Sequence, residues 1–286
     1  MAESEADVNF FNFRPSNSSA AGNDERKDRV PHKNAPKFKP ADLYYDMTGD
    51  KIVVIFNHYE YQKTIYFKND KPNSRTGTHK DVTKIKDTFG ELGFKVITYT
   101  DCKYADIMDR MREVSLQDHT YTSCLIIVIL THGEKGGELY AADRPYQLQD
   151  VTLKLENGHE SLVKVPKLIF IQACRGGLLD AGRRIEYDGQ PATNNTMLVP
   201  KHINFLIMQS SVEDHIAWRD EDGSWLIQEL CEIIQNYHDS LDILQMIVLT
   251  TRNVAFKRIS HTKKAKTDGK KQTPETRFTL IKLLKL

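Results

Sequence analysis

Short apolar runs alternate with segments of helical period along most of the chain. The runs are rich in β-branched side chains, which predicts strands over 51–57, 94–99, 124–130, 168–171 and 203–208. Between and after them, apolar residues recur every three or four positions. This spacing predicts helices over about 82–92, 104–118, 225–234 and 241–254, and a short helix or loop over 147–162. A final apolar stretch, 277–286, predicts another strand.

The order of these elements decides the fold class. Strands that alternate with helices predict an α/β protein, with a mainly parallel sheet covered by helices on both faces. Residues 1–40 have no apolar period and are rich in Ser, Asn, Asp, Lys and Pro. Such a composition does not offset the entropy of ordering a chain, so these residues are expected to form a disordered leader.

Composition and charge narrow the class of protein further. The chain has 286 residues and a formal charge of +1, which gives no overall field toward nucleic acid or a membrane surface. The longest apolar runs are strand-sized and far short of a membrane span. The four cysteines lie far apart without a Cys-x-x-Cys pair, which argues against a metal site or a disulfide framework. A cytoplasmic protein is the expectation.

Two of the predicted buried strands end in motifs that carry chemistry. The run 168–171 leads into Gln-Ala-Cys-Arg-Gly around Cys174, and the run 124–130 leads into Thr-His-Gly-Glu around His132. The carboxyl ends of parallel strands meet at one edge of a sheet, where such folds place their chemistry. A lone cysteine after an apolar run is more often a core residue, and a lone histidine is more often a surface residue. Together they favour a thiol nucleophile with an imidazole acid–base partner.

The motif around Cys174, with His132 placed 42 residues before the cysteine, resembles the signature of caspases, which are cysteine proteases that cut after aspartate. The resemblance covers about 41–286. It implies a caspase-like three-layer fold with a six-stranded sheet, and neither a cofactor nor a metal. It also implies that the backbone N–H groups of Gly133 and Cys174 form the oxyanion hole, and that the carbonyl of Asn73 orients the imidazole.

The resemblance also implies a pocket for the aspartate side chain. Its members would be Arg75, in Ser-Arg-Thr-Gly-Thr, and Arg219, in Ala-Trp-Arg, with Gln172 at the floor. A planar guanidinium matches a carboxylate with two hydrogen bonds. Any one of these arginines taken alone is more often a solvated surface charge.

The residues before Arg219 are expected to bind the substrate backbone as an added strand. By resemblance, Ala217 stands where serine is more usual, and Trp218 walls the next pocket along. Trp225 either walls the pocket four residues before the cut or packs in the core. The acidic segment 220–222 and the basic loop 257–271, which lacks aromatic residues, leave the preference of that distal pocket open.

The segment 178–200 is long and polar, which is unusual inside a compact domain and points either to a functional segment or to a plain surface loop. Asp188, in Ile-Glu-Tyr-Asp-Gly, resembles the site at which caspase precursors are cut, and Asp180 is a weaker candidate. Asp28 is a candidate for removal of the leader. The implied division is a propeptide over 1–40, a large-subunit region over 41–188 with the linker from about 178, and a small-subunit region over 189–286, folded from about 201.

The short leader is similar to that of effector caspases, which implies an executioner role in apoptosis. The implied partners are protein substrates with an exposed aspartate, an upstream initiator caspase, inhibitor-of-apoptosis proteins and a second copy of the chain. The dimer would form through the C-terminal strand, with the run 278–284 at the interface, and no nucleic acid or membrane partner is expected. Two alternatives are a catalytically impaired caspase-like scaffold and a related peptidase that cuts after basic residues.

Overall fold

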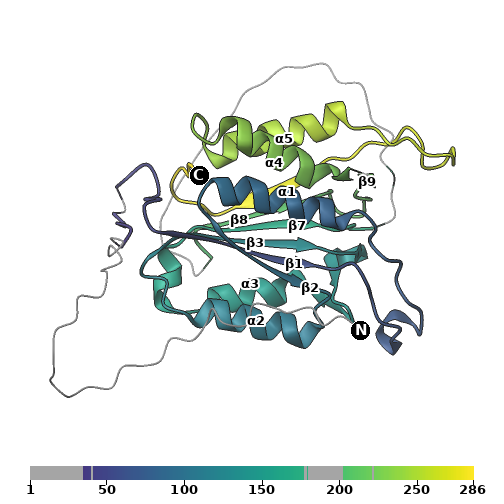
Figure 1. Ribbon diagram of the computed structural model, residues 1–286, viewed down its shortest axis with the longest axis horizontal. Coiled ribbons are helices and arrows are strands. Elements are labelled where there is room, and N and C mark those ends of the chain that lie inside the picture. The colour runs from purple at the N-terminus through teal and green to yellow at the C-terminus, as the bar shows by residue number, and fades with distance from the viewer. Residues whose placement is uncertain (1–34, 40, 177–178, 180–201, 221) are drawn as a thin grey trace, which may run out of the picture. The chain divides into compact units, whose positions relative to one another are not determined.

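A central sheet organises the chain, and it appears edge-on in the computed structural model of Figure 1. The structure describes residues 35–39, 41–176, 179, 202–220 and 222–286. Five parallel strands and one antiparallel edge strand lie in the order β11-β8-β7-β3-β1-β2. Their bounds are β1 Asp50–Asn57, β2 Lys95–Thr100, β3 Thr122–Leu130, β7 Lys167–Gln172, β8 Phe205–Gln209 and β11 Glu275–Phe278. The predicted mainly parallel six-stranded sheet is confirmed.

The register of the central strands decides where their polar ends come out. Asn57 of β1 lies beside Leu130 of β3, and Leu130 lies beside Gln172 of β7. Every residue of β3 and β7 is buried, as expected for central parallel strands covered on both faces. The segments that follow β1, β3 and β7 therefore leave the sheet at one level, around the point where the strand order reverses between β1 and β3.

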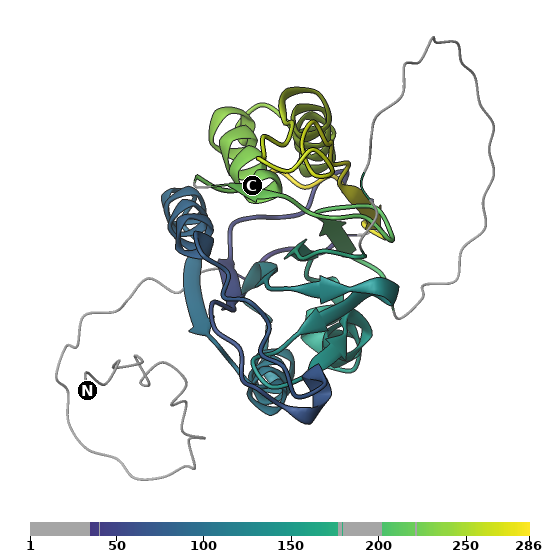
Figure 2. The same ribbon diagram turned by 90° about the vertical axis from the view of Figure 1, so that its right-hand side faces the viewer.

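Helices cover the two faces of the sheet as separate layers. Helices α1, α4 and α5 lie on one face and α2 and α3 on the other, and the view turned by 90° shows the same two layers (Figures 1 and 2). Side chains alternate along each strand, so β1 gives Val53 and Ile55 to the first layer and Val54 and Phe56 to the second. The bounds are α1 Thr78–Glu91, α2 Tyr104–Leu116, α3 Leu148–Glu156, α4 Trp225–Tyr237 and α5 Ile243–Lys257. Within the described ranges, no helix is both long enough and apolar enough to cross a membrane.

Smaller elements lie between the main strands and helices. A three-stranded antiparallel sheet follows β3 directly and is formed by β4 Gly133–Glu134, β5 Glu138–Tyr140 and β6 Pro145–Gln147. A two-stranded ribbon is formed by β9 Arg219–Asp220 and β10 Gly223–Ser224. Three 3-10 turns span Ile65–Phe67, Lys135–Gly137 and Glu160–Lys164. Apolar period does not reveal strands of two or three residues, and the sequence analysis did not predict them.

The predicted C-terminal strand over 277–286 is wrong in its bounds. Strand β11 is Glu275–Phe278, and it pairs antiparallel with β8. After β11, Leu283 forms an isolated β-bridge with Tyr44, and the side chain of Leu284 is fully buried in the core. Part of the apolar run 278–284 is therefore used within the chain, and β11 forms one of the two edges of the sheet.

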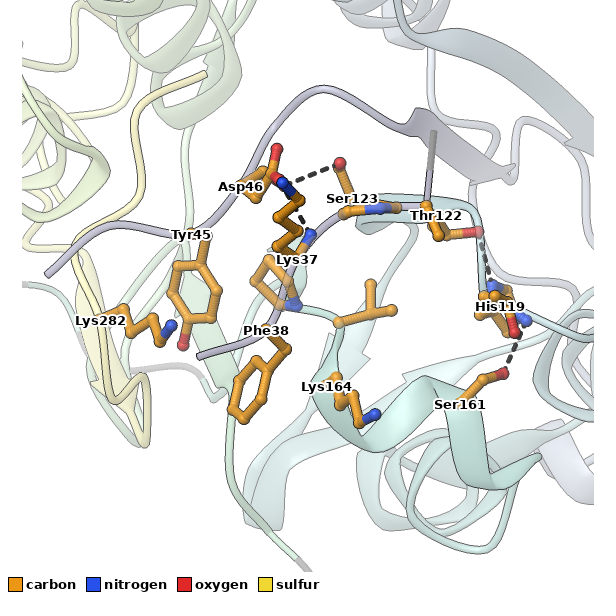
Figure 3. Close-up of a pocket in the computed structure, with 15 residues that line it drawn as sticks. Lys37, Phe38, Tyr45, Asp46, His119, Thr122, Ser123, Ser161, Lys164 and Lys282 are labelled. Carbon is orange, nitrogen blue, oxygen red and sulfur yellow. Dashed lines mark hydrogen bonds between the residues drawn. The ribbon is translucent and has the colours of Figure 1, made fainter. Parts of the chain in front are cut away.

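The part of the leader that the structure describes makes contacts. The backbone N–H of Lys37 donates to Asp46 Oδ2 at 2.9 Å, and the ammonium of Lys282 lies 4.6 Å from the centre of the Phe38 ring. These residues line a cavity of about 240 Å³ beside Thr122, at the amino end of β3 (Figure 3). The expectation of a disordered leader over 1–40 therefore does not extend to 35–39, while 1–34 lie outside the described residues.

The amino end of β7 carries a buried cation. Lys167 is 2% exposed, and its ammonium donates to the carbonyls of Val165 at 2.7 Å and Leu162 at 3.0 Å. It also lies 4.8 Å from the centre of the Phe205 ring. Burial lowers the pKa of Lys167 from 10.5 to about 7. The side chain thus releases its proton in the folded protein far below the pH at which it does so in the unfolded chain.

This difference predicts how stability depends on pH. Between about pH 7 and pH 10.5 the unfolded chain binds the Lys167 proton and the folded protein does not, so the contribution of this residue to stability rises with pH. Relative to Lys167→Met, the wild type should gain roughly 1–2 kcal/mol in free energy of unfolding from pH 7 to pH 9, measured by denaturant titration. The exposed Lys164→Met is the control and should show no such trend. A pH-independent difference between Lys167→Met and the wild type would contradict the prediction.

Candidate active site

His132 comes out of the sheet directly after β3 and is held by a backbone carbonyl. Its Nε2 donates to the carbonyl oxygen of Asn73 at 2.7 Å, as expected for a carbonyl that orients the imidazole. Since a carbonyl only accepts, Nε2 carries the proton and Nδ1 is the nitrogen left to accept one. Burial lowers the pKa of His132, the bond to Asn73 raises it, and the charges of Arg75 and Arg219 lower it further.

Cys174 comes out of the sheet two residues after β7. Its thiol donates to the carbonyl of Ala217 at 3.6 Å, and not to the imidazole. Burial raises the pKa of the Cys174 thiol, while the bond to Ala217 and the charges of Arg75 and Arg219 lower it. In this state the sulfur is protonated and faces the expected substrate strand.

Gly133 is required where the two motifs meet. A Cβ at this position would lie 2.1 Å from the carbonyl oxygen of Cys174 and 2.8 Å from that of Glu138. No side chain fits between these backbones. The two residues whose N–H groups are expected to form the oxyanion hole are thus in direct contact through their main chains.

Arg75 lies in the same region and is almost inaccessible, with 1% of its surface exposed. Its guanidinium donates to the carbonyl of His58 at 3.1 Å and to the hydroxyl of Thr78 at 2.8 Å. Burial lowers its pKa to about 10, and the charge of Arg219 also lowers it, so it stays a cation at neutral pH.

Arg219, at the start of β9, lies beside the loop that carries Arg75. A Cβ on Gly77, two residues after Arg75, would lie 3.9 Å from Cδ of Arg219. Among the residues that the structure describes, no carboxylate oxygen lies within 4.0 Å of a guanidinium nitrogen of either arginine, so neither forms an ion pair there. Gln172 is 3% exposed, and its side-chain oxygen has no hydrogen-bond partner in the described part of the chain.

The arrangement therefore gathers a thiol, an imidazole and two guanidinium groups, and among the described residues neither guanidinium forms an ion pair, although the charge of the more distant Asp81 acts on both. A thiol beside an imidazole is suited to acyl transfer, and the paired cations are suited to a carboxylate. The chain also matches a known family over this whole region: residues 50–285 match the family model of the caspase domain, peptidase C14. The chain belongs to the caspase family. Caspases are cysteine-type endopeptidases, which agrees with this chemistry.

Individual caspases match over much of the chain. Caspase-1 of Spodoptera frugiperda is 35% identical over 84% of this chain and 77% of its own length, and mouse Caspase-6 is 31% identical over 85% and 91%. Caspase-3 of Xenopus laevis is 35% identical over 64% of this chain and 65% of its own length. The crystal structure of the Spodoptera Caspase-1 superposes with a TM-score of 0.77, at 31% identity, over 91% of this chain and 96% of that one.

The two tryptophans of this caspase lie together beside the expected substrate strand. Trp218 and Trp225 stack with ring centroids 5.9 Å apart. Trp225 is 4% exposed and donates through Nε1 to Asp220 at 3.0 Å. Trp225 is therefore buried, as the core alternative expects, and its ring lies directly against Trp218 of that strand.

Sequence reasoning missed Asp81, which supports the ribbon that carries Arg219. The buried carboxylate of Asp81 accepts from the backbone and the hydroxyl of Ser224, at 2.8 and 2.7 Å, and from Gln228 at 2.9 Å. A signal was present, because Asp81 is spaced with Thr78 and Ile85 on the buried face of α1. A carboxylate on a core face needs buried donors.

Gln272 links the basic loop to the expected substrate strand and was also missed. Its side chain accepts from the N–H of Trp218 at 2.6 Å and donates to the carbonyl of Ser210 at 2.7 Å. At the other end of this loop, Nη1 of Arg258 lies 3.7 Å from Oδ2 of Asp220. The candidate processing residues Asp28, Asp180 and Asp188 lie outside the described residues.

The contact of Gly133 with Cys174 gives a direct prediction. Gly133→Ala should lower kcat/KM by about 100-fold or more, because the added methyl pushes apart the two main chains that are expected to stabilise the oxyanion. Gly90→Ala is the matched control, since a Cβ there meets nothing within 4 Å, and it should keep full activity. Steady-state kinetics on an aspartyl peptide, with a melting curve for each variant, measure the effect. Activity of Gly133→Ala within about twofold of the wild type would contradict it.

Proposed function

We propose that this caspase is an endopeptidase that cuts proteins after aspartate. The observation that carries the proposal is the pair of guanidinium groups, Arg75 and Arg219, without a carboxylate partner among the described residues. Buried charge is costly unless it is paired, so the site is suited to receive an anion. The unpartnered oxygen of Gln172 marks a further polar group at the same site.

The positions of the other groups support an acyl-transfer sequence. Nδ1 of His132 takes the proton of the Cys174 thiol, and the sulfur attacks the carbonyl carbon that follows the bound aspartate side chain. The C–N bond breaks, and the imidazolium gives its proton to the leaving amine. Water, activated by the same imidazole, then breaks the thioester, which releases the acid and restores the thiol. The N–H groups of Gly133 and Cys174 would stabilise the negative oxygen in both halves.

The single chain has features suited to a precursor. The thiol of Cys174 is bonded to Ala217, on the strand that is expected to bind substrate, and burial raises its pKa. We infer that cleavage after Asp188, in the linker of 178–200, lets this strand separate from the sulfur. An upstream initiator caspase is the inferred activator, and an executioner role in apoptosis is the inferred setting.

The free edge of β11 supports a dimer of processed chains. Strand β11 lies at the end of the sheet order, and Phe278 at its end is 53% exposed. An unpaired edge strand is a template for a second strand. We infer that β11 pairs with its copy, which would give a dimer of large–small heterodimers. Inhibitor-of-apoptosis proteins are further inferred partners.

Covalent labelling tests the proposed activity. An irreversible peptidyl-aspartyl ketone should form one adduct, on Cys174, and the buried Cys124 and Cys231 should stay unmodified. The variant Cys174→Ala should form no adduct and should lose turnover while it keeps its melting temperature. Mass spectrometry of the protein, with its linker intact and with its linker cut, measures the adduct.

The controls in this experiment separate the alternatives. An asparaginyl ketone should fail, because it offers no charge to the two arginines. Labelling by a lysyl ketone and not by the aspartyl ketone would establish a peptidase for basic residues. Absence of any adduct on the cut protein would establish a scaffold without activity. Either result refutes the proposed function.

Processing is tested separately. Asp188→Ala should leave one uncut chain, with kcat/KM at least about tenfold below that of the cut wild type. A gel of the protein after treatment with an effector-activating caspase measures the cut, and peptide hydrolysis measures the activity. Asp180→Ala is the matched control in the same linker. Full activity of an uncut Asp188→Ala chain would refute activation at this residue.

A further inference from the structure

Tyr61 stacks on two histidine rings, one of which is the proposed catalytic imidazole of His132. The segment after β1 brings it there, and the N–H of Gln62 anchors that segment to the carbonyl of Ala142 at 2.7 Å. Tyr61 is 3% exposed. Its ring stacks on His132 with centroids 5.1 Å apart, and it also stacks on His58 with centroids 6.1 Å apart. The phenol is thus fully enclosed and in contact with the ring that the mechanism uses.

The hydroxyl of Tyr61 bonds the main chain of the same histidine. The backbone N–H of His132 donates to it at 3.0 Å, and the hydroxyl of Thr131 lies 2.9 Å from it. Thr131 in turn donates to the carbonyl of Tyr140 at 2.5 Å. A carbonyl only accepts, so the single Thr131 proton is used there, and Tyr61 must donate to Thr131. The direction of each hydrogen bond in this series is therefore fixed.

The remaining bonds of His132 complete its fixation. Its carbonyl accepts from the N–H of Tyr140 at 3.0 Å, and its Nε2 donates to Asn73. Tyr61 supplies the acceptor for the backbone N–H and the plane on which the imidazole rests. Burial raises the pKa of Tyr61, so the phenol stays a donor at neutral pH.

We propose that Tyr61 is a positioning residue for His132, and that its hydroxyl is needed to hold the imidazole at the angle that serves both Asn73 and the thiol. This inference rests on the proposed catalytic role of His132. A phenylalanine here would keep the stacked ring. It would lose the hydroxyl, which leaves the N–H of His132 without its acceptor and the Thr131 hydroxyl without its donor.

Tyr61→Phe is the test, since it removes one oxygen and keeps the ring. We expect kcat to fall about tenfold while KM stays within about twofold, because the lost bond holds a catalytic group and not the substrate. The limb of the pH–rate profile that reports the imidazole should move to lower pH. The bond to Asn73 raises the pKa of His132, and displacement of the ring would weaken that bond, so the pKa should fall. Rates are normalised to active sites titrated with the aspartyl ketone.

Two further variants separate positioning from stability. Tyr146→Phe removes another buried phenol oxygen, one that has no hydrogen-bond partner among the described residues, and should leave kcat and the pH profile unchanged. Thr131→Val interrupts the same chain one bond further on and should lower kcat in the same direction. The double variant with Tyr61→Phe should lose less than the two single losses combined, because both changes break one network.

The outcomes are distinct. A Tyr61→Phe enzyme with the kcat and pH profile of the wild type overturns the inference, even if its melting temperature falls. An equal loss in Tyr146→Phe overturns it as well. Full activity of His132→Ala would instead overturn the proposed function. A loss in His132→Ala together with an unchanged Tyr61→Phe refutes the positioning role alone.

Discussion

Two guanidinium groups, a buried one on Arg75 and a half-buried one on Arg219, form no ion pair within the described protein, and the rest of this site depends on this constraint. Arg75 is 1% exposed, and its hydrogen bonds go to a carbonyl and a hydroxyl, which hold its guanidinium in place without neutralising it. Such a group is unfavourable in an empty site and favourable once a carboxylate enters. Under the proposed function, part of the folding free energy is converted into affinity for one kind of side chain.

The sheet makes this arrangement possible because it aligns three strand ends. Asn57, Leu130 and Gln172 lie side by side, so the segments that carry Arg75, His132 and Cys174 start from the same level. The fully buried strands behind them leave little freedom for any one to shift alone. A shift of one residue in register would turn a proposed catalytic side chain into the core.

The sequence predicts the large elements and the principal chemical groups. The strands and helices with strong apolar period lie close to where that period places them, and Asn73 meets His132 as the resemblance implies. The short strands β4 to β6 escape prediction because two or three residues carry no period. The bounds predicted for the C-terminal strand are wrong because apolar residues suit a core and an interface equally well. Leu284 fills the core, and the pattern alone gives no way to decide.

The supporting residues are harder to predict for a different reason. Asp81, Gln272 and Tyr61 act through partners far away in the sequence, so nothing beside them in the chain indicates their role. Lys167 is similar, because a lysine at the start of an apolar run is usually solvated, and only the fold buries it. Such residues become visible when each buried polar atom is matched with its donor or acceptor.

The central claim is that the paired guanidinium groups admit one carboxylate, and substrate competition tests it most directly. The measurement is kcat/KM of the cut protein for two peptides that differ only in aspartate or asparagine before the cut. A site built around paired charge predicts a ratio of about 10⁴ in favour of aspartate. A ratio within about tenfold would contradict it, because it would show that the two arginines do not bind the side chain that precedes the cut.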